Sequence, residues 1–327
     1  MRRLKFSLLP GIWFFVFNFY LFAGGQPGDE NKKYVLVIHG GAGGINRGDI
    51  TDSVKKLYLA GLEEALKTGE EILKNGGSSL DAVEKVIRYF EDDPQFNAGR
   101  GAVLTSDGTA ELDASIMSGI DKSAGAVASV TRIKNPISAA RAVMEKSPHV
   151  LLAGTGAEKF AEANGLELVD NKYFITDAQM NSWQKRKAAL DKKGTVGAVA
   201  MDMNGNLAAG TSTGGMMMKM PGRIGDAPII GAGTYADNNT CAVSCTGWGE
   251  KFIKNAVAFH VSALMEYKNY TLKEAVDEIM LKKLSKGDGG LIAIDKNGNY
   301  YMEYTTQSMF RGVVNSEGKK EFKIWED

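Results

Sequence analysis

The sequence predicts a mixed α/β protein in which helices cover layered β-sheets. Strand-like runs precede helical patterns in each half of the chain, without the regular alternation of a doubly wound fold. The 327 residues are 44% hydrophobic with a formal net charge of +0, as expected for a globular protein with a substantial core. Asn204-Gly205 lies between two apolar runs, which is the strongest short hairpin signal in the chain.

The first half of the chain opens with the strand-like run KYVLVIH and a glycine-rich segment. Apolar residues at helical spacing then predict two helices, the first ending at Asn75-Gly76-Gly77. Glycine-punctuated β-structure follows, with a turn at Asp107-Gly108. The expected elements are a strand at 33–39, helices at 54–73 and 79–90, β-structure at 96–119 and 124–133, a helix at 136–144, a short buried strand at 149–154 and a helix at 157–164.

The second half follows a polar segment, residues 166–194, that lacks a sustained apolar period and is interpreted as a mobile linker. The pattern then turns to strand on both sides of Asn204-Gly205. The remaining expected elements are helices at 250–267 and 272–284 and strands at 291–294 and 300–304.

The N-terminus differs in kind from the rest of the chain. A basic start, MRRLK, precedes a mostly apolar and aromatic segment from Leu8 to Ala23, and small residues follow it. The apolar part is too short for a comfortable membrane span, so this order predicts a secretory signal peptide at residues 1–25, with an uncleaved anchor as the alternative. We therefore expect an exported protein, periplasmic or secreted.

Composition argues against several classes of function. Lysine and arginine are scattered among acidic residues, whereas phosphate binding needs a concentrated basic face, so no nucleic-acid partner is expected. Cys241 and Cys245 would lie about 13 Å apart on a strand, beyond disulfide reach, and we expect two buried thiols. The three histidines are far apart, and none has a second ligand at zinc-like spacing, so no catalytic cofactor is expected.

The junction between Gly194 and Thr195, in DKKGTVGAV, has two interpretations. The ordinary one is a charged loop that enters a strand. The other is that the chain is cut between the two residues, so that Thr195 becomes N-terminal. The new α-amine, with a reference pKa of about 7.7–8.0, would then supply the local base that a threonine nucleophile needs.

A two-residue turn at Asn204-Gly205 would set the register of the following hairpin. Thr195 would then lie opposite Gly214, with Thr213 one step away diagonally. A bulge or a longer turn would shift the register by a residue but would keep the two threonines adjacent. The hairpin therefore places a second hydroxyl beside the candidate nucleophile.

Six segments, in order, resemble the plant-type L-asparaginase/isoaspartyl aminopeptidase family, whose members are N-terminal nucleophile hydrolases related to the glycosylasparaginases. The resemblance covers essentially the whole chain after the expected signal peptide. The segments are HGGAGG (39–44), FNAGRGAVLTSDGTAELDASIMSG (96–119), GTVGAVAMD (194–202), GTSTGG (210–215), PGRIGDAPIIGAGTYAD (221–237) and SCTGWGE (244–250).

The resemblance implies a four-layer αββα sandwich and self-cleavage before Thr195. An α-subunit at 26–194 and a β-subunit at 195–327 would fold together as one domain. The implied reaction is hydrolysis of β-aspartyl dipeptides and of the side-chain amide of L-asparagine through a β-aspartyl-enzyme intermediate, with glycosylasparaginase activity as the alternative. A dimer of cleaved αβ units is also implied.

The same resemblance assigns catalytic roles to four residues. Thr195 resembles the nucleophile, and Thr213 the threonine whose hydroxyl supports it. Thr246 and Gly247 resemble an oxyanion hole made of a hydroxyl and a backbone N–H, where losing one donor typically costs about 3–4 kcal/mol.

Substrate-binding roles follow from the resemblance in the same way. Arg223 resembles the group that binds the α-carboxylate of the aspartyl moiety, which suits a guanidinium, and Asp226 the group that binds its α-amine. Gly249 resembles a backbone contact to that amine, and Asn97 a polar group that supports the site. The segment FEDDPQFNAGRG resembles a loop that binds a structural sodium ion through backbone carbonyls, at Phe90, Glu91, Asp93, Phe96, Ala98 and Arg100.

Three positions depart from the family patterns. Trp248 stands between the two glycines of CTGWG, where many relatives have a small or polar residue, so an indole could narrow the pocket or stack on a leaving group. TSTGG replaces the TSTNG of glycosylasparaginases, and Gly194 replaces their aspartate before the threonine. These two departures favour asparagine and β-aspartyl peptides over glycosylated asparagine.

Two other classes of protein compete with this interpretation. A dinucleotide-binding enzyme would explain glycines after a strand, but the third glycine of that motif falls at Asn46. A secreted binding protein would leave the hairpin threonines unused and would remain a single uncut chain. His39 is interpreted as a structural residue that closes the first strand.

Overall fold

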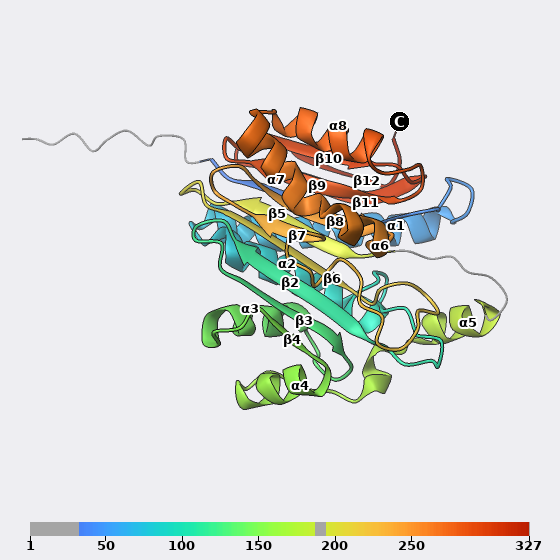
Figure 1. The fold of residues 1–327 in the computed structure, drawn as a ribbon. Coiled ribbons are helices and arrows are strands. Elements are labelled where there is room, and N and C mark those ends of the chain that lie inside the picture. Colours follow the sequence, from blue (N-terminus) through green and yellow to red (C-terminus); the bar gives the residue numbers. More distant parts are fainter. Residues whose placement is uncertain (1–32, 187–193, 327) are drawn as a thin grey trace, which may run out of the picture. The chain divides into compact units, whose positions relative to one another are not determined.

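A computed structural model describes residues 33–186 and 194–326 (Figure 1), so the expected signal peptide at 1–25 lies outside the described residues. The helices are α1 (Asp52–Lys74), α2 (Ser79–Asp92), α3 (Pro136–Lys146), α4 (Gly154–Ala163), α5 (Asp177–Arg186), α6 (Gly249–Asn255), α7 (Val257–Lys268) and α8 (Leu272–Lys282), with short 3₁₀ turns η1 (Gly99–Gly101) and η2 (Asn171–Phe174).

Strands from both halves of the chain form two sheets. The larger sheet has the order β12-β11-β1-β5-β6-β2-β3-β4, and the smaller has the order β10-β9-β8-β7. The strands are β1 (Val35–Gly43), β2 (Leu112–Ser118), β3 (Ala124–Val130), β4 (Leu151–Ala153), β5 (Val196–Met201), β6 (Leu207–Thr213), β7 (Thr234–Ala236), β8 (Cys241–Gly247), β9 (Gly289–Asp295), β10 (Tyr300–Tyr304), β11 (Ser308–Asn315) and β12 (Lys320–Lys323).

The large sheet is covered on both faces because its strands alternate two sets of apolar residues. On β1, Leu36 and Ile38 join a core with helices α1 and α2, whereas Val35 and Val37 join a core with the small sheet. Helices α7 and α8 pack on the small sheet in turn (Figure 1). The predicted mixed α/β class with helix-covered sheets is confirmed.

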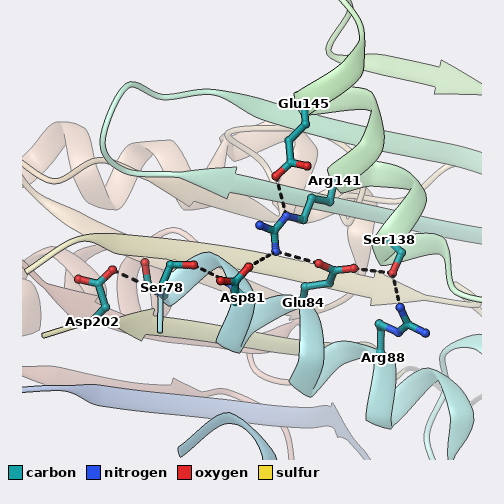
Figure 2. Close-up of polar contacts among 9 residues, drawn as sticks. Ser78, Asp81, Glu84, Arg88, Ser138, Arg141, Glu145 and Asp202 are labelled. Atoms are coloured by element: carbon teal, nitrogen blue, oxygen red, sulfur yellow. Dashed lines mark hydrogen bonds and ion pairs between the residues drawn. The ribbon is translucent and has the colours of Figure 1, made fainter. Parts of the chain in front are cut away.

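The helices that cover the large sheet begin and pack as their sequence dictates. The side chains of Thr51 and Ser78 cap the first turns of α1 and α2. Figure 2 shows Arg141 of α3 among three carboxylates, with Nη1 bonded to Asp81 and Glu84 of α2 and Nε to Glu145 of its own helix. This network fixes α3 beside α2.

The structure differs from the expected secondary structure in four places. The strand expected to be buried at 149–154 is β4 at the edge of the large sheet, where Leu151 is exposed. The helix expected at 250–267 is broken at Ala256, which has a φ of +45°. The expected linker contains η2 and α5 up to residue 186. Strands β11 and β12 were not predicted at all.

The β5–β6 hairpin has a different register from the predicted one. Its loop has three residues between Asp202 and Asn206, whose backbones pair directly. The loop is longer because the Asp202 carboxylate accepts hydrogen bonds from the Asn204 and Asn206 amides, and Gly205 adopts a φ of +77°. The predicted position of Thr195 opposite Gly214 is therefore wrong by one residue, since Val196, the next residue, pairs with Ser212 and not with Thr213.

The prediction for the cysteines is confirmed. Cys241 and Cys245 lie on β8 as fully buried free thiols. The glycines after His39 belong to β1 and do not form the strand-to-helix turn of a dinucleotide-binding motif. Among the described residues, no helix is both long and apolar enough to cross a bilayer.

Candidate active site

Thr195 and Thr213 meet at the ends of two neighbouring strands. Thr195 immediately precedes β5, and Thr213 is the last residue of β6, its antiparallel neighbour. Both side chains are buried, and the Thr195 hydroxyl donates to the Thr213 hydroxyl over 3.1 Å. The predicted adjacency of the two threonines is therefore confirmed, although the register is not.

The carbonyl oxygen of Gly194, which belongs to the bond expected to break, accepts two hydrogen bonds. Thr213 Oγ1 donates to it over 3.0 Å and Asn97 Nδ2 over 2.5 Å. Asn97 is itself held, because Nδ2 also donates to Gly215 O (2.8 Å) and Oδ1 accepts from the Val103 amide (2.9 Å). Both donors are thus fixed before charge develops on this oxygen, which is the arrangement that stabilises an oxyanion.

The backbone of β1 runs directly against the Gly194–Thr195 junction. Gly41 has a φ of +111°, and a Cβ atom there would lie 3.1 Å from Gly194 Cα and 3.2 Å from Thr195 N. A bulge in the pairing of β1 with β11, between His39 and Gly41, produces this approach. A side chain at position 41 would be strained and would push on the junction, so glycine is required here.

His39 contacts Thr195 from the adjacent strand. Its Nδ1 lies 3.0 Å from Thr195 O, and its Nε2 lies 3.0 Å from Ser244 Oγ. Burial lowers the pKa of His39 to about 3, so the ring is neutral near pH 7 and is a poor general base. This agrees with the prediction of a structural histidine, but its contact with the candidate nucleophile was not predicted.

The two residues expected to form an oxyanion hole lie at the end of β8. Thr246 is fully buried, and its hydroxyl accepts a hydrogen bond from the Ala42 amide over 3.1 Å. Ala42 follows Gly41, so Thr246 reaches the same part of β1 as the junction. Gly247 has a φ of +147°, and a Cβ there would lie 2.2 Å from Asp288 O. Their role in catalysis stays a prediction.

Arg223 forms an ion pair with Glu250 and not with Asp226. Arg223 Nε donates to Glu250 Oε1 over 2.9 Å, and Nη2 donates to Oε2 over 2.8 Å. The pair is partly exposed, with 15% of the Arg223 side chain and 42% of the Glu250 side chain accessible. On the other edge of the guanidinium, Nη1 pairs with no carboxylate in the described part of the chain, and Nη2 also contacts Met216 Sδ over 3.5 Å. Nη1 can therefore receive a carboxylate from a ligand.

Asp226 lies beside Arg223 as a buried carboxyl group. Its Oδ2 atom has no hydrogen-bond partner among the described residues. Burial raises the pKa of Asp226 to about 7, whereas the charge of Arg223 lowers it. A Cβ on Gly249 would lie 2.8 Å from Asp226 Oδ1 and 3.0 Å from Arg223 Nη2. Three of the four predicted substrate-binding residues are thus brought together, whereas the fourth, Asn97, lies at the Gly194–Thr195 junction. An unpartnered buried carboxylate suits a cationic ligand group.

Two charged residues behind this pocket were not predicted. Asp113 of β2 pairs with Thr213 across the sheet, is fully buried, and has no partner for Oδ2 among the described residues. Burial raises its pKa, while Lys219 and Arg223 lower it. Lys219 is also buried and donates to Glu111 O over 2.9 Å. The strict alternation in ELDASIM places Asp113 on an inward face, and this signal could have identified it.

The segment expected to bind sodium forms the end of α2 and a tight loop that leads into η1. Its expected ligands are the backbone carbonyls of Phe90, Glu91, Asp93, Phe96, Ala98 and Arg100. A Cβ on Gly99 would lie 2.2 Å from Glu91 O, and one on Gly101 would lie 2.0 Å from Phe96 O. The carbonyl oxygens of Glu91 and Phe96 therefore lie close to the glycines of the loop. The carbonyls of Asp93, Phe96 and Ala98 accept backbone hydrogen bonds within the segment, and sodium binding there stays a prediction.

Known proteins resemble the chain over almost its whole length. A sequence model of the family described as Asparaginase matches residues 32–324. The isoaspartyl peptidase of Escherichia coli is 48% identical over 295 residues, which cover 85% of this chain and 92% of that protein. The isoaspartyl peptidase/L-asparaginase of Mus musculus is 46% identical over 291 residues (84% and 86%), and that of Bos taurus is 44% identical over 289 residues (84% and 91%).

Proposed function

The chain belongs to the asparaginase family, and from this premise we propose that it is a threonine amidohydrolase activated by its own cleavage. It hydrolyses β-aspartyl dipeptides and the side-chain amide of L-asparagine. The observation that carries the proposal is the Gly194 carbonyl, which accepts hydrogen bonds from both Thr213 and Asn97 next to the Thr195 hydroxyl.

Self-cleavage begins when Thr195 Oγ1 attacks the carbonyl carbon of Gly194. The carbonyl oxygen becomes negatively charged, and the hydrogen bonds from Thr213 and Asn97 stabilise it. The bond between the carbonyl carbon and Thr195 N then breaks, and the nitrogen takes up the proton that the Thr195 hydroxyl has lost. Water hydrolyses the ester that remains, leaving a carboxylate on Gly194 and a free α-amine on Thr195.

The α-amine then serves as the base for amide hydrolysis. It accepts the hydroxyl proton as Thr195 Oγ1 attacks the β-carbonyl carbon of the substrate. Thr246 and Gly247 stabilise the resulting oxyanion. The leaving amine or ammonia takes the proton, and water releases aspartate from the β-aspartyl ester.

The charged pocket explains why an aspartyl moiety is the substrate. The open edge of Arg223 suits the α-carboxylate, and the unpartnered Oδ2 of Asp226 suits the α-ammonium group. Two fixed charges of opposite sign thus recognise the zwitterionic end that asparagine and β-aspartyl dipeptides share.

We also propose that the layers form the four-layer αββα sandwich of N-terminal nucleophile hydrolases. The packing of α1 and α2 on the large sheet, and of α7 and α8 on the small sheet, supports this arrangement.

A sodium ion at residues 90–100 would be detected as a higher melting temperature in NaCl than in choline chloride. A dimer of cleaved units and export through residues 1–25 are testable by native mass spectrometry and by the mature N-terminal sequence.

Denaturing electrophoresis with N-terminal sequencing tests the proposed function. The purified wild-type protein should give two fragments, the smaller beginning Thr195-Val196-Gly197. The Thr195→Ala variant should fold, remain one chain and lack amidase activity, and Thr195→Ser should be cut slowly and retain some turnover. A folded wild-type chain that stays intact, or a fully active Thr195→Ala variant, would refute the proposal.

A further inference from the structure

A row of polar side chains crosses the core between the two sheets, where the surrounding contacts are apolar. The row contains five side chains, all of them fully buried and all hydrogen-bonded. Burying such groups is unfavourable unless each finds a partner, so a continuous row of them in a sandwich core requires an explanation. We call this row the polar seam; its members are His39, Ser115, Thr211, Thr234 and Ser244.

The contacts of the polar seam form one uninterrupted path to Thr195. Ser115 Oγ donates to Thr234 Oγ1 over 2.8 Å, and Thr234 donates to Thr211 over 2.6 Å. Thr211 Oγ1 lies 2.7 Å from Ser244 Oγ, which lies 3.0 Å from His39 Nε2. His39 Nδ1 lies 3.0 Å from the carbonyl oxygen of Thr195.

The chemistry of the last acceptor fixes the direction of the whole path. Thr195 O can only accept a hydrogen bond, so His39 Nδ1 carries the proton. The lowered pKa of His39 keeps the ring neutral, so its other nitrogen, Nε2, has no proton and must accept from Ser244. Ser244 donates its only proton in this bond and must therefore accept from Thr211. If Ser244 donated instead to Gly210 O, also 3.0 Å away, a buried ring nitrogen would lose its donor.

The other end of the seam reaches the substrate pocket. Ser115 Oγ also lies 2.5 Å from the carbonyl oxygen of Ala227, the residue that follows Asp226. Because that oxygen can only accept, the single proton of Ser115 is shared between Ala227 O and Thr234 Oγ1 as a bifurcated hydrogen bond. Along the way the seam passes over Gly197, where a Cβ would lie 2.1 Å from Ser244 Oγ and 2.3 Å from His39 Nε2. The seam therefore connects the loop that binds the substrate with the residue that attacks it, and it needs a glycine at position 197.

We propose that the polar seam is a positioning device that holds the Thr195 backbone at a fixed place relative to the Asp226 loop. This inference rests on the proposed function. After cleavage Thr195 has no preceding residue, so its carbonyl becomes a main anchor of the terminal residue. The hydrogen bond from His39 orients that carbonyl, and thereby the amine and the hydroxyl, while Ser244 and the hydroxyls behind it hold the tautomer of His39.

Two substitutions of His39 separate its two contacts. An asparagine amide nitrogen can occupy the place of Nδ1 and donate to Thr195 O, whereas a glutamine amide oxygen can occupy the place of Nε2 and accept from Ser244. His39→Gln should therefore lose the Thr195 contact and lower kcat by about 10- to 100-fold, because misplacing a reacting group by about 1 Å costs up to about 100-fold. KM should change far less, and His39→Asn should recover most of kcat.

Ser244→Ala and its matched control make the test independent of the folding of His39 variants. Ser262 is a comparable buried serine whose Oγ lies 2.6 Å from Thr240 Oγ1, outside the seam. Both alanine variants should lower the melting temperature, but only Ser244→Ala should lower kcat. If Ser244→Ala and His39→Gln keep the kcat of Ser262→Ala while the wild type is cut and active, the seam proposal alone fails. A wild type that is neither cut nor active overturns the proposed function as well.

Discussion

The two halves of the candidate site differ in how completely their polar groups are paired. Around the Gly194–Thr195 junction the functional groups are neutral, and each has a partner, including both hydroxyls, the Asn97 amide and the His39 ring. In the pocket of Arg223 the groups are charged, and Asp226 and Asp113 each retain a buried carboxylate oxygen without a partner among the described residues.

This difference indicates what each region still lacks. The junction contains its own reactant, the peptide bond after Gly194, so its hydrogen bonds can be complete before any ligand arrives. Under the proposed function, the pocket is completed by a substrate that brings an ammonium group to Asp226 and a carboxylate to Arg223. Variants in the two regions should therefore affect different steps.

The largest effect is expected at the junction. Thr213→Val keeps the shape of the side chain but removes the donor to the Gly194 oxygen and the acceptor for the Thr195 hydroxyl. Self-cleavage should slow by about 100- to 1,000-fold, as for the loss of one oxyanion donor. The measurement is the rate at which the Thr195 fragment appears on denaturing gels; cleavage at the wild-type rate would contradict the assignment.

A substitution in the pocket should separate the two steps. Arg223→Met removes the cation that faces the substrate carboxylate, and kcat/KM should fall by about 10- to 100-fold, the equivalent of about 1.5–3 kcal/mol for a charged hydrogen bond. Cleavage at Gly194–Thr195 should proceed normally. Uncut Arg223→Met protein that is otherwise folded would show that the two regions are not independent.

The pH dependence of kcat/KM should report the unpartnered carboxyl group. The pKa of Asp226 is raised to about 7 in the free protein, so the group is protonated below that pH and binds an ammonium group poorly. Activity should therefore rise with pH through about 7. The α-amine of Thr195 titrates in a similar range, and Asp226→Asn separates the two, since this variant should retain only the amine limb at a much lower rate.

The smallest effect is expected far from both regions, in the network of Figure 2. Arg141→Met removes two ion pairs between α2 and α3 and one within α3, all partly exposed. The free energy of unfolding should fall by about 1 kcal/mol, the upper end for exposed ion pairs, and the melting temperature by about 2 °C. Both cleavage and hydrolysis should remain as in the wild type; a change in either would mean that the large sheet transmits strain to the junction.

Local patterns were sufficient to predict much of the fold. Apolar residues at helical spacing located α1 and α2, and strand-like apolar runs located β1, β5 and β6. The register of the hairpin was missed because the Asp202 carboxylate accepts hydrogen bonds from the amides of Asn204 and Asn206 and so lengthens the loop. The Asn204-Gly205 signal does not reveal this interaction. Strands β11 and β12 owe their structure to pairing with β1 and with each other, not to a strong pattern of their own.

The candidate site, like the fold, could be predicted from the sequence only in part. The adjacency of Thr195 and Thr213 followed from one hairpin, and the cluster of Arg223, Asp226 and Gly249 was expected only from the resemblance. His39 is distant from Thr195 in the sequence, and Arg223 is distant from Glu250. Their contacts depend on the tertiary fold, so no local spacing predicts them.

The strand order of the large sheet has a consequence for the life of the enzyme after cleavage. Strand β1, which precedes the cut, lies between β5 and β11, which follow it, and β2 borders β6 from the other fragment. The two fragments would therefore share one sheet by interleaved strands and could separate only if that sheet came apart. With the proposed cleavage, the precursor would fold as a single chain, whereas the cleaved protein, once denatured, would have to refold in a bimolecular reaction. Maturation would thus be a one-way step, and recovery from denaturation should depend on protein concentration.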